Sequence, residues 1–262
     1  MSIVGSVGAG GQNNRVDVKV IQAALNLSMP DRLKEAARLT VDGINGNTTI
    51  SSIKTFQNEV LGINNPSGKV DPRSETHLSL GRYLSKGFSK DALRAIMGHG
   101  ATTTVDSYHS LILTSKNNYD VNTPLRPAHF LAQVGHESLS FTYTEEIASG
   151  AAYEGRKDLG NSEKGDGTRF KGRGLIQLTG RVNYEAYGKH IGVDLLKEGD
   201  EDLVSRVAKL AVDAAFWFWY SRKLNRYADL DDIRAVTRRV NGGFNGLDDR
   251  MRYLERAKFF LM

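Results

Sequence analysis

Apolar residues recur at helical spacing along most of this chain, and this period limits the fold more than any other feature of the sequence. Val18, Ile21 and Leu25 lie on one face of a first segment, and Ile53 and Phe56 lie on one face of a second. The same period continues at about residues 75–84, 89–97, 105–115, 126–136, 181–188, 202–220, 231–240 and 247–260. The pattern therefore predicts a mainly α-helical protein.

Two short stretches alternate between apolar and polar residues instead. Residues 141–144 (FTYT) and 175–179 (LIQLT) have the period of two that is typical of a half-buried strand. In the second stretch Gln177 and Thr179 share one face, which suits them to line a cleft while the alternate apolar residues pack inward. We therefore expect a short β-hairpin at a cleft in an otherwise helical domain.

The composition removes several kinds of chemistry. The chain has 262 residues and no cysteine, so disulfides, thiol nucleophiles and thiolate zinc sites are excluded. The zinc-protease motif His-Glu-x-x-His also fails, because Ser140 stands four residues after His136. We expect no metal and no cofactor, and catalysis by carboxylate, histidine, hydroxyl or lysine side chains.

The chain carries a net charge of +5 and has an isoelectric point near 9.3, which favours an anionic partner. Basic residues number nine against seven acidic ones up to residue 85, and 26 against 23 beyond it. Because there is no basic tail, nucleic acid is the less favoured partner. We also expect no membrane insertion and no signal peptide, hence synthesis in the cytoplasm.

The segment up to residue 84 contains helical stretches separated by tight Asp-Gly and Asn-Gly turns. It resembles the three-helix peptidoglycan-binding module of wall hydrolases over about residues 5–82. The resemblance is carried by residues 17–22 (DVKVIQ), Leu25, residues 41–43 (VDG), Gly46, Thr48, Ile53 and residues 56–57 (FQ). It implies wall binding as a role of the whole domain and leaves the individual contacts open.

A boundary is expected at residues 85–89 (SKGFS), because Ser89 can cap a new helix. We therefore predict a peptidoglycan-binding domain at residues 1–84 and a catalytic domain at residues 85–262.

The helical segment at residues 126–136 leads into the pair His136-Glu137. His129, Gln133 and His136 lie on neighbouring turns, so polar groups surround the Glu137 carboxyl group. At a helix C-terminus this group meets the negative end of the helix dipole, which together with burial favours the protonated form that a general acid needs. The alternative is a surface glutamate.

Further carboxyl groups follow at Glu145-Glu146, nine residues after Glu137 in the case of Glu146. In one continuous helix nine residues turn about 900°, which would place the two groups on opposite faces. The alternation at residues 141–144 predicts instead that the chain leaves the helix and folds back. Two carboxylates can then flank a cleft at the roughly 6.5–9.5 Å typical of inverting glycosidases.

A glycine-rich stretch covers residues 165–184. It is not a phosphate-binding loop, because Arg173-Gly174 stands where lysine and a hydroxyl residue are required. Two interpretations are left: a substrate-binding wall that includes Gln177, or simple turns at Gly172 and Gly174 with Gln177 as a satisfied buried amide.

From about Arg126 to the C-terminus, the chain resembles glycoside hydrolase family 19, the family of chitinases and phage lysozymes. Its signatures are residues 128–138 (AHFLAQVGHES), 170–184 (FKGRGLIQLTGRVNY) and 240–246 (VNGGFNG) with Arg250. A wall-binding module joined to this domain resembles a modular endolysin of phages that infect Gram-negative bacteria. The fold implied is a largely helical, lysozyme-like catalytic domain.

The resemblance implies inverting cleavage of a β-1,4 glycosidic bond next to N-acetylated sugars. Glu137 matches the general acid, Glu146 matches the general base, and Thr179 matches the hydroxyl that helps to hold the attacking water. The further positions that match substrate-binding or cleft residues, together with the neighbour of the acid, are Gln177, Asn183, Asn241, Arg250 and His136. Glu145 and Glu154 stay rivals of Glu146.

The leading hypothesis is an endolysin that hydrolyses the bond between N-acetylmuramic acid and N-acetylglucosamine for host lysis. The alternatives are a chitinase that uses the same residues and a noncatalytic protein that binds wall or nucleic acid; an amidase would need a zinc site. We expect a monomer that acts on periplasmic peptidoglycan and depends on a separate pore-forming protein for release.

Overall fold

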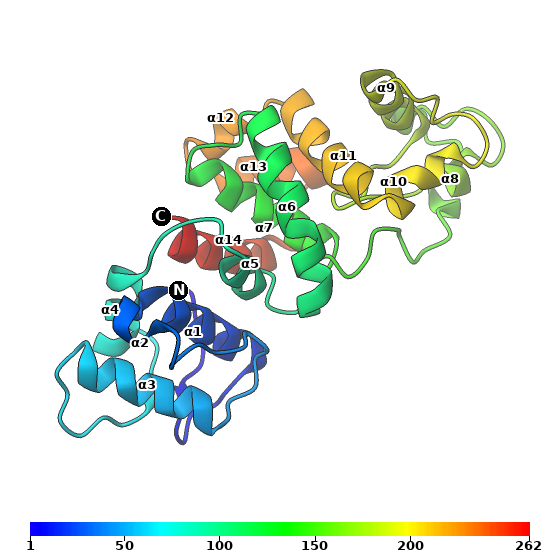
Figure 1. Cartoon of the computed structure of the whole chain (residues 1–262). Helices are drawn as coiled ribbons and strands as arrows, with labels where there is room; N and C mark the ends of the chain where they lie inside the picture. The colour runs from blue at the N-terminus through cyan, green and yellow to red at the C-terminus, as the bar shows by residue number, and fades with distance from the viewer. The chain divides into compact units, whose positions relative to one another are not determined.

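The computed structural model describes all 262 residues, and helices dominate it (Figure 1). The chain divides into two compact units, one formed by Met1–His109 with Met251–Met262 and the other by Ser110–Arg250. Both divisions fall inside helices, namely α6 (Thr102–Asn118) and α14 (Leu247–Leu261). The predicted mainly helical fold is confirmed. None of the helices combines the length and apolar composition needed to cross a bilayer.

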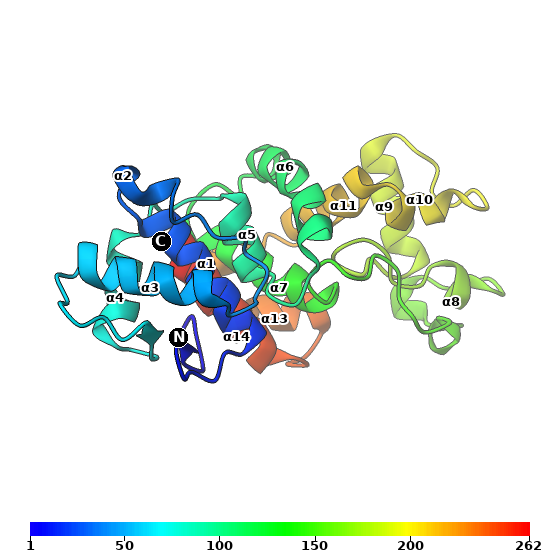
Figure 2. The same ribbon diagram turned by 60° about the horizontal axis from the view of Figure 1, so that its bottom comes forward.

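Helix α1 is the centre of the first unit. The other helices that lie wholly in this unit are α2 (Asp31–Lys34), α3 (Asn47–Glu59), α4 (Glu75–Tyr83) and α5 (Lys90–Ile96). Helices α3, α4 and α5 all contact α1 (Arg15–Ser28), and α1 and α3 lie side by side in Figure 2. The apolar face predicted for α1 is fully buried, because Val18, Ile21 and Leu25 have no exposed surface.

The Asp42-Gly43 turn is tied to α1 by the amide of Gln22. Its Oε1 accepts a hydrogen bond from the Gly43 backbone at 2.9 Å, and its Nε2 donates to Asp42 Oδ1 at 3.0 Å. Gly43 has φ of 81°, and a Cβ there would lie 2.6 Å from the backbone oxygen of Arg15. These motif residues therefore build a turn that only glycine fits, whatever the unit binds.

The first compact unit continues past the expected boundary between residues 84 and 85. As predicted, Ser89 caps α5 by accepting a hydrogen bond from Ala92 N at 3.1 Å. Helix α5 packs on α1, and Asn26 Nδ2 of α1 donates to Asp91 Oδ2 at 3.0 Å. A separate wall-binding domain at residues 1–84 stays a prediction.

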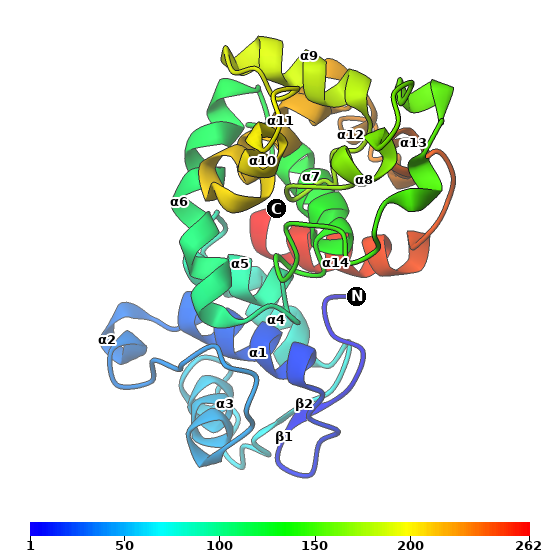
Figure 3. The same ribbon diagram turned by 90° about the vertical axis from the view of Figure 1, so that its right-hand side faces the viewer.

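The single paired sheet lies in the first unit, not beside the expected cleft. Strand β1 (Val7–Gly8) pairs antiparallel with β2 (Lys69–Val70), as Figure 3 shows. The hairpin predicted from residues 141–144 and 175–179 is therefore wrong in its position: both stretches are turns. Only isolated bridges join this part of the chain, from Arg173 to Glu145 and to Leu178.

The second unit is built around α7 (Leu125–Glu137). Its other α-helices are α8 (Asp166–Arg169), α9 (Arg181–Ile191), α10 (Leu203–Arg206), α11 (Ala208–Ser221), α12 (Asn225–Ala228) and α13 (Ile233–Asn241), and its 3₁₀ helices are η1 (Ala151–Tyr153), η2 (Lys157–Leu159) and η3 (Asp200–Asp202). Phe130 of α7 stacks on Phe216 of α11 with ring centroids 3.9 Å apart, and the edge of Trp219 meets it at 5.6 Å. Helices α12 and α13 also contact α7. Polar residues near the end of α7 are thus carried by a rigid core helix.

The buried Asp166 joins α8 to the first residue of α9. Arg181 donates to both of its carboxylate oxygens, at 2.9 Å and 2.7 Å. This hydrogen bonding lowers the pKa of Asp166 against the opposing effect of burial.

We expect Asp166→Asn to lower the free energy of unfolding by about 2 kcal/mol at pH 7, because the buried carboxylate loses its charge and its two charge-assisted hydrogen bonds from Arg181. A depressed folded pKa contributes stability above the unfolded value of about 3.9 and loses it as the pH falls through the lower folded value. The difference between parent and variant should therefore shrink below about pH 4. Urea titrations of parent and variant at pH 7 and below about pH 4 measure this difference in the free energy of unfolding. The exposed carboxylate variant Asp158→Asn serves as control, and an equal loss in both variants would contradict the assignment.

Candidate active site

A left-handed turn follows Glu137 and ends α7. Leu139, Ser140 and Phe141 have φ of 47°, 57° and 67°. The buried Ser138 hydroxyl donates to Val134 O at 2.6 Å and accepts from Phe141 N at 2.9 Å. Such backbone costs roughly 1–2 kcal/mol per residue, so the turn depends on these bonds and on packing. The chain thus leaves the helix directly after Glu137, as the sequence predicted, but through a turn and not a strand.

Glu137 is the last residue of α7, and its partner is Arg250 in the first turn of α14. Arg250 Nη2 donates to Glu137 Oε1 at 2.5 Å, and Nη1 donates to Gln133 Oε1 at 2.6 Å. The Arg250 side chain is fully buried, while that of Glu137 is 16% exposed. Oε2 of Glu137 has no hydrogen-bond partner in the chain, so one carboxyl oxygen is available to a substrate.

His136 fixes the same segment from the neighbouring position on α7. Its Nδ1 lies 2.8 Å from Asp249 Oδ2. Its ring covers Gly246 so closely that a Cβ there would lie 2.1 Å from the ring. His136 therefore holds the start of α14 against α7, which is a structural position beside the predicted acid.

Glu146 lies in the returning chain beside residues 171–173. Its backbone N donates to Gly172 O at 2.9 Å. Its carboxylate accepts from Tyr153 Oη at 3.0 Å through Oε1 and from Gly172 N at 3.1 Å through Oε2. Each carboxylate oxygen has two lone pairs, so each can accept one more hydrogen bond, for instance from water.

Tyr153 links the two carboxyl groups electrostatically. Burial of the ring, the hydrogen bond and charge of Glu146, and the charge of Glu137 together raise the pKa of the Tyr153 hydroxyl. Charges act on a pKa in this way only at short range. Glu146 thus contacts this hydroxyl directly, while the charge of Glu137 also acts on its pKa.

The rival carboxylates have other partners. Glu145 lies 3.1 Å from Lys171 Nζ and 3.6 Å from Arg173 Nε. Glu154 accepts from the backbone of Gly165 at 2.7 Å and of Gly167 at 2.9 Å, so it is bound to the start of α8 and not to Tyr153 or Gly172. The geometry thus favours Glu146 over Glu145 and Glu154.

The turn at residues 174–178 brings Gln177 close to Gly172, which also contacts Glu146. Gln177 has φ of 56°, and its Nε2 donates to Gly174 O at 3.1 Å. A Cβ on Gly172 would lie 2.8 Å from Gln177 Oε1 and 3.3 Å from Glu146 Oε2, so a side chain at this position would displace the Gln177 amide. The alternation of exposure that suggested a strand arises because the turn buries Leu175, Ile176 and Leu178 and leaves Gln177 half-buried.

Thr179 and Asn183 follow Gln177 in the predicted substrate-binding wall. The Thr179 hydroxyl donates to Gln177 O at 2.8 Å, and Asn183 Nδ2 donates to Thr179 O at 2.7 Å. Asn241 behaves differently: it is exposed at the end of α13, and its side chain makes no hydrogen bond within the chain. The contacts thus form two sets, Glu137 with Arg250 and His136 at the junction of α7 and α14, and Glu146 with Gln177, Thr179 and Asn183, while Asn241 joins neither.

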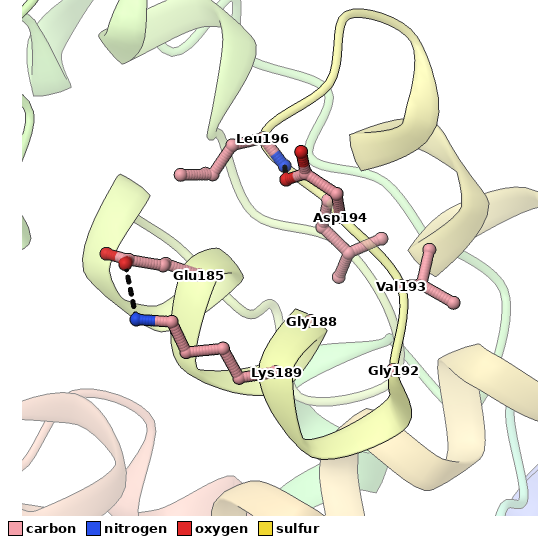
Figure 4. A pocket seen from close by; sticks show the side chains of 8 residues that line it. Glu185, Gly188, Lys189, Gly192, Val193, Asp194 and Leu196 are labelled. Atoms are coloured by element: carbon pink, nitrogen blue, oxygen red, sulfur yellow. Dashed lines mark hydrogen bonds and ion pairs between the residues drawn. The ribbon is translucent and has the colours of Figure 1, made fainter.

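Sequence reasoning missed two members of this site. Tyr153 ends the short 3₁₀ helix η1, where the sequence has no periodicity, and nothing in its spacing marks it as a partner of Glu146. The Ser138 hydroxyl bridge was also missed, although a serine directly after a helix is a known sign of local capping. A hollow of about 320 Å³ at the C-terminal end of α9, shown in Figure 4, includes none of the predicted site residues.

Known proteins have sequences similar to that of this chain. A family model of glycoside hydrolase family 19, described as chitinase class I, matches residues 119–235. A protein of Haemophilus influenzae described as containing a glycosyl hydrolase family 19 domain is 34% identical over an alignment of 157 positions, which covers 48% of this chain and 75% of that protein. The chain belongs to glycoside hydrolase family 19. The matched range of the family model includes Glu137, Glu146 and Thr179, and it ends before Asn241 and Arg250.

Other relatives of this family 19 glycoside hydrolase are chitinases. An endochitinase of Arabidopsis thaliana is 42% identical over 116 residues, which cover 44% of this chain and only 39% of the plant protein. A solved structure of a bacterial family 19 chitinase superposes with a TM-score of 0.54 at 21% identity, covering 66% of this chain and 94% of that one. At this identity the superposition shows the fold, and it confirms the predicted lysozyme-like, largely helical class.

We expect Tyr153→Phe to lower kcat about tenfold, because Glu146 loses a hydrogen bond that orients it and such a bond to a charged group contributes about 1.5–3 kcal/mol. KM should change little. Steady-state kinetics on an N-acetylglucosamine oligomer or a glycan strand, with melting curves alongside, measure the effect. Tyr143→Phe changes an exposed tyrosine and serves as control. Equal activity of both variants would show that Tyr153 does not position Glu146.

Proposed function

We propose that this glycoside hydrolase is an endolysin that cleaves the β-1,4 bond between N-acetylmuramic acid and N-acetylglucosamine in peptidoglycan with inversion. The observation that carries the proposal is that two carboxyl groups are fixed by different partners, Glu137 by Arg250 and Glu146 by Tyr153 and Gly172. An inverting glycosidase needs this pair, one group to protonate the leaving oxygen and one to activate water.

In this mechanism Glu137 donates the proton from Oε2 to the glycosidic oxygen as the bond from that oxygen to the anomeric carbon breaks. Arg250, which holds Oε1, stabilises the carboxylate that results. Glu146 takes a proton from a water molecule, and the hydroxide attacks the anomeric carbon from the opposite face. Tyr153 and Gly172 orient Glu146, and the Thr179 oxygen can accept a hydrogen bond from the water.

Peptidoglycan is proposed as substrate for two reasons. Residues 5–82 resemble a peptidoglycan-binding module, and the net charge of +5 suits an anionic wall polymer. The second candidate, a chitinase, is favoured by the names of relatives such as the endochitinase of Arabidopsis thaliana. Both reactions would use the same carboxyl pair.

We expect Glu137→Gln to lower the rate of cleavage by about a thousandfold, because general acid catalysis contributes roughly 10²–10⁴. Purified sacculi are digested with parent and variant, and the products are identified by mass spectrometry. New reducing ends on N-acetylmuramic acid support the proposal, and free peptide stems would indicate an amidase. Glu198→Gln, which changes an exposed carboxyl group outside the site, is the control. Near-parental cleavage by Glu137→Gln would refute its role as the acid.

A further inference from the structure

A strongly basic hollow lies between the end of α11 and α13. Its volume is about 430 Å³, and Ser221, Arg222, Lys223, Arg226 and Arg239 line it. Four of these five residues are cations and none is acidic. Lys223, Arg226 and Arg239 are exposed, so the charge is accessible to a ligand.

The charge of this basic hollow is not balanced within the chain. None of its four cations forms an ion pair. The carboxylates of the nearby 229–232 segment have other partners: Asp229 binds Arg126 at 2.8 Å through both oxygens, and Asp232 caps α13 through Ala235 N at 2.9 Å. The counter-charge must therefore come from solvent ions or from a ligand.

Aromatic rings hold the guanidinium groups in place. Arg226 and Arg239 each lie 4.5 Å from the centroid of the Tyr227 ring, so one ring keeps two like charges close together. Arg222 lies 3.6 Å from the Phe218 ring, and burial lowers its pKa. A bound anion would offset the repulsion between Arg226 and Arg239 and the cost of burying the Arg222 charge. Because the rings already fix these guanidinium groups, the groups lose little conformational freedom when an anion binds.

The basic hollow is connected to the substrate wall of the candidate active site. Arg222 Nη2 donates to Asn183 Oδ1 at 3.0 Å, while Asn183 Nδ2 donates to Thr179 O at 2.7 Å. Thr179 in turn donates to Gln177 O at 2.8 Å, and Gln177 lies against Gly172 beside Glu146. A polymer lying along this wall would therefore pass next to the cations.

We propose that this basic hollow binds the carboxylate groups of the peptide stems of peptidoglycan while the glycan strand lies along the wall that includes Asn183. The inference rests on the proposed muramidase function and names the feature that would separate it from a chitinase. Chitin has no charged groups, whereas every stem on a muramic acid ends in carboxylates. Guanidinium groups pair with carboxylates through two parallel hydrogen bonds, which suits this ligand.

The first test uses the double variant Arg226→Gln/Arg239→Gln, which removes two exposed cations of the basic hollow. The double variant Lys197→Gln/Lys209→Gln is the matched control, because it removes two exposed cations elsewhere in the second unit. Initial rates are measured at low substrate concentration on intact sacculi and on glycan strands stripped of their stems by an amidase. We expect the first variant to lose about tenfold on intact sacculi and nothing on stripped strands. The control should match the parent on both.

The second test measures binding in the full chain with Glu137→Gln, which keeps the ligand intact. A disaccharide carrying a tetrapeptide stem and the same disaccharide without the stem are titrated by calorimetry. The stem should improve affinity about tenfold, and the improvement should disappear in Arg226→Gln/Arg239→Gln. Inorganic phosphate is titrated in the same way. If Arg226→Gln/Arg239→Gln loses phosphate binding but keeps the affinity gained from the stem, the basic hollow is a general anion site and the assignment is wrong.

The outcomes separate the two proposals. If the parent cleaves chitin oligomers but neither sacculi nor stripped strands, the proposed muramidase function is wrong, and the binding test still decides the role of the basic hollow. If the parent cleaves sacculi and the two double variants behave alike in both tests, the basic hollow does not bind stems, and the muramidase function stands.

Discussion

One buried guanidinium holds the candidate active site together. Arg250 is fully enclosed and reaches Glu137, Gln133 and the backbone oxygen of Asn245, so it joins the end of α7 to the first turn of α14. Breaking a buried charge pair by removing one partner typically costs about 3–5 kcal/mol, because the other charge is left without compensation. The position of the Glu137 carboxyl group, and with it the proposed proton transfer, depends on this contact.

The second carboxylate depends on backbone geometry. The left-handed turn after Glu137 is stabilised by the Ser138 hydroxyl, and it allows the chain to return with Glu146 beside Gly172. The Gln177 amide and the Glu146 carboxylate both lie close to Gly172, so a side chain there would displace the Gln177 amide. The site thus contains unfavourable backbone conformations next to the reacting groups, as active sites commonly do. The rigid core formed by Phe130, Phe216 and Trp219 supports that strain.

Much of the fold could be predicted from the sequence, because the period of the apolar residues directly reflects which faces are buried. The helices at the ends of the predicted site, α7 and α13, are found where the pattern placed them. The turns could not be predicted in this way. Leu139, Ser140 and Phe141 have no intrinsic preference for positive φ, so the Ser138 hydroxyl bonds and packing impose it. Tyr153 was not predicted for a related reason. Its contact with Glu146 depends on how the short 3₁₀ helix η1 packs, and such packing leaves no periodic signal in the sequence.

The central claim is that Glu137 and Glu146 act together as acid and base on opposite faces of the sugar. Proton NMR of the first products, recorded before the anomers equilibrate, tests this directly with glycan strands or N-acetylglucosamine oligomers as substrate. Inversion of a β-linked substrate predicts that the newly formed reducing end appears first as the α anomer. Initial formation of the β anomer would mean retention through a covalent intermediate or another route, and it would contradict the assignment of Glu146 as a general base.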